Sequence, residues 1–536
     1  MKRLVFLVVV ASFLGGCPSK KKTRSSDTFY LHMAAEPKTL DAFTSRTDAY
    51  AGAITGQIFD TLLDRDKDTY APKPSLAESY EVSANGKEFT FKLRKGVTFT
   101  DGKPLTAADV KFSFDAIFDD KYQVIDIRPY YENIDRCEVV DDHTVKFFVK
   151  KKYFQNLMFI GGMEIVPKHY YEERKKEHNI KVLGSGPWMI DEYKQGRSMT
   201  LKKNPNWWGK DLEEFKDYYR FGKKKYTFIK EEKVKFEAFK KGDLDYIGLS
   251  SEEFITKTDG DPWGKSVHKE TVQNKAPMAL PFIGWNNKKE LFKDKKVRQA
   301  LTMLYDRDMM VEKFFYNQAD PAAGPWYPAN PAADKSRKPL PFNPKKAGEI
   351  LKAAGWADDD KNGVLEKEIN GKKKEFRFTL LNPNPDWERY FTVYKEELKK
   401  AGIDMSITNL EWNAFQRKMD EHEFDALYLV WTGTVNIDPK QVWHSGSSKK
   451  GGSNFISYKN ARVDELIDKG RLELNDEKRY KMFREVYNLI ADDAPYIFLF
   501  YKKASFYGYN DRVIREKPFY NYTVGTDMWQ FKAQVD

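Results

Sequence analysis

The length of the chain constrains its fold more than any other feature of the sequence. A single hydrophobic core stops growing at about 250–300 residues, and longer chains divide into separately packed units. With 536 residues, this chain is expected to form two or three lobes. Hydrophobic residues make up 41% and charged residues 32% of it, a balance that is typical of a globular protein with several cores.

The N-terminus, MKRLVFLVVVASFLGGC, indicates a lipoprotein signal peptide over residues 1–17. Two basic residues precede an apolar run from Leu4 to Leu14, which is too short to span a bilayer as a helix. Leu14-Gly15-Gly16-Cys17 resembles the lipobox of bacterial lipoproteins, whose cysteine thiol receives a diacylglycerol. We therefore expect lipid attachment at Cys17, a flexible tether over residues 18–27, and a location in the cell envelope, in the periplasm or on the outer surface, anchored to a membrane.

Charge and motif content exclude several classes of function. The net charge is +11, but the lysines are scattered and form no basic helix or RNA-binding motif, so no nucleic-acid partner is expected. The chain has no His-Glu-x-x-His motif and no Gly-x-Ser-x-Gly motif, and we expect neither an enzyme nor a cofactor. If Cys17 is lipidated, the other cysteine, Cys137, has no partner and is expected to be a small buried hydrophobic residue.

Local signals predict mixed helices and strands. Asn85-Gly86 lies between two extended runs and indicates a hairpin, and Asp141-Asp142 marks a second one. Thr106 and Asp109 form a capping box that opens a helix. Asn343-Pro344 supplies another helix start, and Gly355 follows its last turn. Aromatic residues make up 15% of the chain, enough to line a large amphipathic cleft as well as the cores.

Longer segments follow one another in a family-specific order. They are EPKTLD at 36–41, KPSLAESYEVSANGKEFTFKLRKGVTFTDGKPLTAADVKFSFD at 73–115, GSGPW at 184–188, LKKNPNWWG at 201–209, EAFKKGDLDY at 237–246, FKDKKVRQALTMLYDRDMM at 292–310 and SNFISYKNARVDELID at 453–468. In this order and spacing, the chain resembles the family 5 extracellular solute-binding proteins, the peptide- and nickel-binding receptors of ABC importers.

The resemblance implies an α/β fold, a two-lobed periplasmic-binding-protein clamp of type II, in the large peptide-binding subclass with an extra inserted subdomain. Lobe I would comprise residues 28–280 and 505–536, with the insertion at about 65–180, and lobe II residues 281–504. The crossing strands, and with them the hinge, would lie near 282–285 and 500–502. Ligand that touches both lobes would favour the closed state.

The function implied is that of an extracytoplasmic lipoprotein, a monomer, that captures peptides or peptide-like solutes and delivers them to the permease and ATPase subunits of an importer. The alternatives are a receptor of the same fold for an oligosaccharide, haem or a nickel chelate, a receptor that senses without transport, and, from another class, a hydrolase.

The resemblance also indicates candidate ligand-binding residues. Peptide-binding members carry a Trp-x-x-Asp pattern in which the tryptophan lines the cleft and the aspartate pairs with the peptide's α-ammonium group. Trp431 matches the tryptophan, but Thr434 stands in place of the aspartate. Asp438, followed by Pro439, either caps the next helix or takes over the ammonium pairing. The remaining candidates are Trp443, Ser453 and Asn454.

One loop has part of a metal-binding pattern. Asp358, Asp360, Asn362 and Gly363 match the start of an EF-hand calcium loop, but position 12 is Ile369 instead of glutamate. The loop is either a solvated turn or a weak calcium site.

Overall fold

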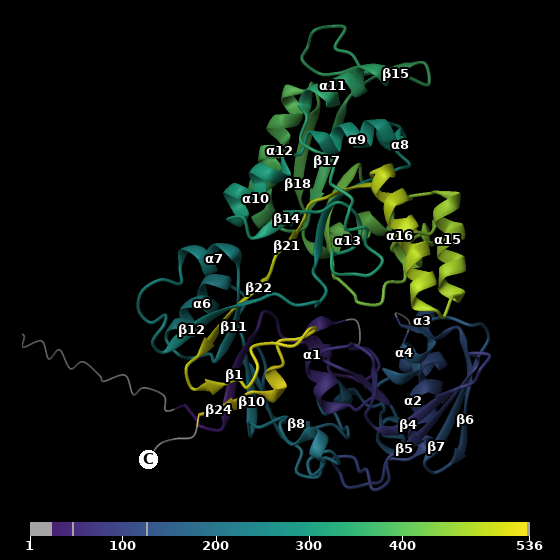
Figure 1. Ribbon diagram of the computed structural model, residues 1–536, viewed down its shortest axis with the longest axis vertical. Helices are drawn as coiled ribbons and strands as arrows, with labels where there is room; N and C mark the ends of the chain where they lie inside the picture. Colours follow the sequence, from purple (N-terminus) through teal and green to yellow (C-terminus); the bar gives the residue numbers. More distant parts are fainter. Residues whose placement is uncertain (1–23, 46–47, 125–126, 533–536) are drawn as a thin grey trace, which may run out of the picture.

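The computed structural model describes residues 24–45, 48–124 and 127–532 and shows two lobes stacked along the long axis (Figure 1). We call lobe I the sheets formed by residues 28–272 and 505–531, and lobe II those formed by residues 280–502. Cys17 and residues 18–23 of the expected tether lie outside the described residues.

Lobe II is built on a five-stranded mixed sheet. Its strand order is β18 (Asp404–Asn409), β17 (Arg377–Asn382), β19 (Ala426–Trp431), β13 (Leu280–Trp285) and β20 (Tyr496–Phe498). β13 runs antiparallel to both of its neighbours, whereas β17 runs parallel to β18 and β19. All six residues of β13 are buried, as expected for a strand with both faces of its sheet covered.

Two hydrophobic cores lie on opposite faces of this sheet. Successive side chains of a strand point to opposite faces, and along β13 Phe282 belongs to one core and Ile283 to the other. The surrounding helices are α8 (Glu290–Lys293), α9 (Lys295–Met303), α10 (Arg307–Phe315), α11 (Pro344–Ala353), α12 (Glu388–Lys400), α13 (Trp412–Asp420), α14 (Lys440–Trp443), α15 (Ala461–Leu472) and α16 (Asp476–Asp493). Two small pairs complete the lobe, β14 (Ala319–Pro321) with β21 (Phe500–Lys502) and β15 (Glu366–Ile369) with β16 (Lys372–Glu375).

Lobe I combines early and late parts of the chain. One sheet has the order β1 (Thr28–Met33), β10 (Lys223–Phe228), β9 (Ser198–Lys203) and β8 (Trp188–Lys194), with α1 (Ala49–Ile58) packed on it. In a second sheet, the late strand β22 (Ser505–Asn510) lies between β11 (Tyr246–Leu249) and β12 (Val267–Val272). β23 (Val513–Ile514) and β24 (Gln530–Phe531) pair near the C-terminus, and α6 (Glu232–Lys240) and α7 (Ser251–Thr256) flank the second sheet.

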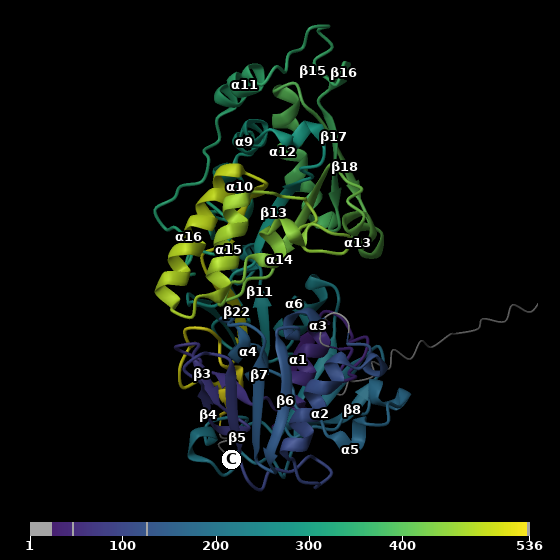
Figure 2. The same cartoon turned by 90° about the vertical axis from the view of Figure 1, so that its right-hand side faces the viewer.

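The remaining elements of lobe I form a unit with its own core. Its antiparallel sheet has the order β4 (Ala77–Val82), β5 (Glu88–Leu93), β7 (Thr144–Val149) and β6 (Ile134–Asp141). A hairpin of β2 (Leu63–Arg65) and β3 (Pro72–Pro74) and the helices α2 (Ala107–Phe118), α3 (Arg128–Tyr131), α4 (Asn156–Gly161) and α5 (Lys168–Tyr171) accompany it. Figure 2 shows α15 and α16 of lobe II directly above this unit.

The local signals in the sequence are found where they were predicted. β4 and β5 form the hairpin around Gly86, whose φ is +66°, and β6 and β7 form the second hairpin. Thr106 and Asp109 make the capping box of α2. The Asn343 side chain caps α11, and Gly355 follows this helix with a φ of +85°.

The expected position of the crossing strands is wrong. Residues 282–285 form part of β13, the strand between β19 and β20 inside lobe II, and residues 500–502 pair with β14 in the same lobe. The chain passes between the lobes through residues 273–279, which join β12 to β13, and residues 503–504, which join β21 to β22. Because β13 is fixed by neighbours on both sides, only these short connections are free of sheet pairing. Among the described residues, no helix is both long enough and apolar enough to span a membrane.

Candidate functional site

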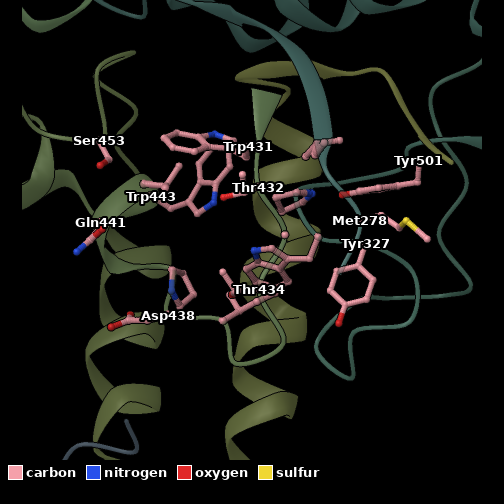
Figure 3. Close-up of a pocket in the computed structure, with 17 residues that line it drawn as sticks. Met278, Tyr327, Trp431, Thr432, Thr434, Asp438, Gln441, Trp443, Ser453 and Tyr501 are labelled. Carbon is pink, nitrogen blue, oxygen red and sulfur yellow. The ribbon is translucent and has the colours of Figure 1, made fainter. Parts of the chain in front are cut away.

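A cavity of about 230 Å³ opens on lobe II where β13 and β19 meet α14 (Figure 3). Its lining is mainly aromatic and aliphatic, with a few hydroxyl, amide and backbone groups. The lining residues are Met278, Leu280, Pro325, Trp326, Tyr327, Trp431, Thr432, Gly433, Thr434, Ile437, Asp438, Pro439, Gln441, Val442, Trp443, Ser453 and Tyr501. An apolar concave surface with a few convergent polar groups is typical of small-ligand sites.

Trp431 is held rigidly at the end of β19. It lies opposite Leu280 in the pairing with β13, and its ring stacks on Phe282 and Phe455 with centroids 6.0 and 5.8 Å away. Its Nε1 donates a hydrogen bond to the Tyr496 hydroxyl, 3.4 Å away. The side chain remains half-exposed, so one part of the indole is free to contact a ligand.

After Trp431 the chain turns sharply past residues 273–279, which cross between the lobes. A Cβ on Gly433 would lie 2.6 Å from the Met278 carbonyl oxygen and 2.7 Å from Pro277, closer than real side chains come. Glycine is therefore required for the chain to leave β19 so close to residues 273–279.

Three further predicted residues have different surroundings. Trp443 lines the cavity but is only 3% exposed and packs on Tyr496, 4.9 Å between ring centroids. Ser453 lines the cavity and is half-buried. Asn454 is not among the lining residues: it is fully buried, donates to the carbonyl oxygens of His444 and Tyr458, and accepts from the Tyr458 N–H. Asn454 thus holds the loop that presents Ser453.

Asp438 already has several partners. Its Oδ1 accepts the N–H of Lys440, the first residue of α14, at 3.0 Å. Its Oδ2 accepts from Arg471 Nε at 2.8 Å and from the Tyr153 hydroxyl at 2.6 Å. The carboxylate therefore bonds to the backbone just before α14, whose N-cap is Pro439, and it also has a counter-charge. Thr434 is exposed, and its hydroxyl donates to the Asn436 carbonyl oxygen at 3.3 Å.

The electrostatics of this cluster favour a charged pair beside a neutral phenol. Burial raises the pKa of Tyr153 well above its usual range, and Asp438 adds to the effect. Burial acts to lower the pKa of Arg471, but Asp438 and Tyr153 outweigh it and the net pKa is raised. Among the lining residues Asp438 alone carries a charge, and Arg471 neutralises it. The cavity therefore presents no unpaired charge from its own lining.

Sequence reasoning missed a second aromatic group in the lining. Trp326, Tyr327 and Tyr501 come from segments that were assigned to no site. Trp326 and Tyr327 lie in Gly324-Pro325-Trp326-Tyr327-Pro328, and two aromatic residues between turn-forming residues were a usable signal. A Cβ on Gly324 would lie 2.5 Å from the Tyr487 ring, so glycine is needed to seat this loop on α16.

The calcium-like loop lies far from the cavity, at the outer end of lobe II beside β15 (Figure 1). Asp358 Oδ2 accepts the Gly363 N–H at 3.0 Å, and Asp360 Oδ1 accepts the Asn362 N–H at 3.2 Å. The Asn362 amide donates to Glu375 at 2.8 Å. These contacts are those of a hydrogen-bonded turn. Within residues 24–45, 48–124 and 127–532, no group of three or more His, Cys, Asp or Glu is placed to hold a metal ion.

Cys137 lies in β6 and is buried and free. Burial raises the pKa of its thiol to about 12, which keeps it protonated and unreactive at neutral pH. It packs in the core of the unit around β4–β7.

Comparison with known proteins decides the family. The model of the bacterial extracellular solute-binding proteins, family 5, matches residues 71–454. The chain belongs to this family. Its members are solute-binding proteins and not enzymes, so the family 5 chain described here binds a solute without transforming it.

Individual relatives agree with this assignment. The oligopeptide-binding protein AppA of Bacillus subtilis is 30% identical over 524 residues, which cover 93% of this chain and 92% of the relative. Its structure with a nonapeptide superposes with a TM-score of 0.78 at 28% identity, covering 94% of this chain and 99% of that one. NikZ of Campylobacter jejuni, solved with Ni(L-His), has the same fold, with a TM-score of 0.79, 23% identity, and coverage of 95% and 100%. Heme-binding protein A of Haemophilus influenzae is 24% identical over 89% of this chain and 88% of the relative.

Proposed function

We propose that this family 5 protein captures peptides or peptide-like solutes between its two lobes and delivers them to the permease and ATPase subunits of an ABC importer. The observation that carries the proposal is the aromatic cavity around Trp431, whose single carboxylate is paired with Arg471. The similarity to an oligopeptide-binding protein along nearly the whole chain supports peptides as the ligand class.

The cavity suits the chemistry of a peptide with apolar side chains. The half-exposed Trp431 offers flat apolar surface that favours side-chain burial, and the buried rings of Tyr327 and Tyr501 belong to the same lining. The hydroxyls of Thr432 and Ser453, which belong to the lining, would bond to amide groups of the peptide. Because the cavity has no unpaired charge, binding would depend on burial and hydrogen bonds more than on charge pairing. A neutral aromatic lining is also the chemistry that holds sugar rings, which makes an oligosaccharide the second candidate.

Lobe closure would follow from ligand contacts on both lobes. A ligand shifts a conformational equilibrium only by its difference in affinity for the two states. We propose that the division at residues 273–279 and 503–504 allows lobe I and lobe II to move as units, and that the importer recognises the closed form.

Small-angle scattering with a mixed nonapeptide pool tests this proposal. At saturation the radius of gyration should fall for the unmodified protein. Trp431→Ala should require far more peptide for the same change, whereas Trp412→Ala should behave normally, because Trp412 is an exposed tryptophan on α13 outside the cavity. An unchanged profile at proven saturation would contradict the clamp mechanism.

We also propose that Cys17 carries a lipid that anchors the protein to a membrane. Support comes from the Leu-Gly-Gly-Cys sequence after a short apolar run. Cys17→Ser should abolish the incorporation of radioactive palmitate and leave the signal peptide uncleaved. Cys137→Ser is the control, because Cys137 is buried in lobe I, and it should be labelled normally. Label on the Cys17→Ser protein would overturn the lipoprotein proposal.

A further inference from the structure

Tyr70 adopts a backbone conformation that tyrosine rarely takes. Its φ is +62°, in the left-handed region where the Cβ of an L-residue meets the backbone. The residue ends the loop between β2 and β3. Strained positions of this kind persist where the surrounding structure requires them, and they concentrate at binding and catalytic sites.

The turn itself does not need a tyrosine side chain. The Tyr70 N–H donates to the Asp66 carbonyl oxygen at 2.9 Å, and the Asp66 N–H donates to the Ala71 carbonyl oxygen at 3.0 Å. The Asp66 carboxylate accepts the N–H groups of Asp68 and Thr69. Glycine at position 70 would keep all of these bonds and remove the strain. The side chain of Tyr70 therefore has to be explained by what its ring contacts.

The ring of Tyr70 packs on Tyr522, which comes from the end of the chain. Their centroids are 5.0 Å apart with an angle of 46° between the planes, and both rings are half-buried. The Tyr522 N–H donates to the Lys67 carbonyl oxygen at 3.0 Å, and the Asn521 N–H donates to Asp68 at 2.9 Å. The two tyrosines thus form an aromatic pair with a fixed backbone on lobe I, and part of each ring is accessible.

The Tyr70–Tyr522 pair is linked to the cavity through residues 273–279, which cross between the lobes. The Lys275 N–H donates to the Asn521 carbonyl oxygen at 2.6 Å. The Tyr327 hydroxyl donates to the Lys275 carbonyl oxygen at 3.5 Å. Tyr327 is itself a lining residue of the cavity. Figure 3 shows its hydroxyl pointing away from Trp431. Tyr327 therefore lines the cavity, while its hydroxyl bonds to Lys275, which is in turn bonded to Asn521 beside Tyr522.

The electrostatics of Tyr327 agree with this placement. Burial raises its pKa to about 12, and the phenols of Tyr522 and Tyr70 are close enough to add to the rise, as is Tyr480 on α16. Tyrosines of both lobes thus lie near Tyr327, which is a lining residue of the cavity.

We propose that Tyr70 and Tyr522 form a second aromatic subsite on lobe I, linked to the cavity of lobe II through Lys275 and Tyr327, that holds a second apolar or aromatic side chain of the bound peptide. The inference rests on the proposed peptide-binding function. It explains why a tyrosine is kept at a position where glycine would fold more easily, and it gives the ligand a contact on each lobe.

A peptide pool with graded aromatic content tests the subsite. The probe is an equimolar mixture of nonapeptides of Ala and Ser that carry no, one or two Phe residues at varied positions, and mass spectrometry identifies the peptides that the whole protein retains. The variant is Tyr70→Gly. Its matched control is Tyr316→Gly, because Tyr316 is also a half-buried tyrosine with a positive φ, of +52°, but it follows α10 in lobe II and is not part of the Tyr70–Tyr522 pair.

The unmodified protein should enrich peptides with two Phe residues over peptides with one. Tyr70→Gly should reduce that enrichment about tenfold, the scale of one aromatic contact, and leave the retention of one-Phe peptides unchanged. Tyr316→Gly should retain the same peptides as the unmodified protein. In both variants the removal of strain offsets part of the packing lost with the ring, and thermal unfolding of both variants shows that each is folded at the temperature of the binding experiment.

Two results would overturn the inference. If Tyr70→Gly enriches two-Phe peptides as the unmodified protein does, the pair is a packing contact only. If the unmodified protein retains no peptide from the pool, the peptide function fails and the subsite with it, a result that differs visibly from the first.

Discussion

The hydroxyl of Tyr153 in lobe I donates a hydrogen bond of 2.6 Å to the carboxylate of Asp438 in lobe II. Arg471 donates to the same oxygen at 2.8 Å, and its guanidinium lies 4.5 Å from the centre of the Tyr153 ring. The adjacent Gln155 amide donates to the Asn436 carbonyl oxygen at 2.8 Å. This contact joins the unit around β4–β7 to lobe II at the edge of the cavity, so it must break whenever that edge opens.

Asp438→Asn should destabilise the protein more than Tyr153→Phe. The first change leaves the partly buried guanidinium of Arg471 without its counter-charge, and the second removes one hydrogen bond. The side chains of Arg471 and Asp438 are 28% and 14% exposed, so the loss of unfolding free energy should be about 1–3 kcal/mol for Asp438→Asn and about 1 kcal/mol for Tyr153→Phe. Urea titration measures both.

The control for this pair is Tyr130→Phe. The Tyr130 hydroxyl bonds to Gln441 at 3.1 Å between the same two lobes, but the side chain is exposed, so the change should be close to zero. Equal effects for Tyr130→Phe and Asp438→Asn would show that the ion pair contributes nothing beyond a surface contact.

Peptide binding should not require a free α-amino group. Thr434 stands where an aspartate would pair with the ammonium, and Asp438 is already paired with Arg471 and bonded to Tyr153. A buried ammonium without a counter-charge costs several kcal/mol. Calorimetric titration of one nonapeptide with and without an N-terminal acetyl group should therefore give comparable affinities. A large loss on acetylation that Asp438→Asn reproduces with the free peptide would mean that Asp438 leaves Arg471 for the ligand.

Stability should depend on pH through Asp60. Its buried carboxylate accepts from Trp208 Nε1 and Ser185 Oγ, both at 2.8 Å, and burial raises its pKa from 3.8 to about 6. Between these values the folded state binds the proton more tightly than the unfolded state. The contribution of Asp60 to stability is therefore greatest below about pH 4 and is lost as the pH rises through 6.

Asp60→Asn should remove this dependence, because the amide does not ionise. At pH 7 to 8 it should raise the unfolding free energy by about 2–3 kcal/mol, an upper value for a pKa shift of about two units. Denaturant titrations at pH 4, 6 and 8 measure the slope. Asp211→Asn, at an exposed carboxylate, should leave the slope as it is. An unchanged slope for Asp60→Asn would show that this carboxyl is solvated in the folded protein.

Features that depend on neighbours in the sequence were predictable. The hairpin at Asn85-Gly86 and the helix that starts at Asn343-Pro344 are determined by backbone preferences over a few residues. Resemblance to the family extended this to the α/β, two-lobed fold. The family resemblance put the crossing segments near residues 282–285 and 500–502, which lie in sheets of lobe II. The sequence of a buried strand does not show which sheet it enters.

The chemistry of the site depended on contacts that the sequence does not reveal. Five of the predicted residues line one cavity because they come from one short segment or its vicinity: Trp431, Thr434, Asp438, Trp443 and Ser453. The partners of Asp438 could not be predicted, since Arg471 is 33 and Tyr153 is 285 residues away. The pairing of Tyr70 with Tyr522 likewise joins two ends of lobe I. Only the folded chain brings such residues into contact.

Native mass spectrometry of the protein purified from its own cells tests the central claim most directly. The account predicts a bound mass in the range of short peptides, released on denaturation and readable as peptide sequences. Trp431→Ala should carry much less of it, and Trp412→Ala should carry the normal amount. An oligosaccharide, haem or nickel chelate in place of peptides, or the same peptide load on Trp431→Ala, would contradict the account.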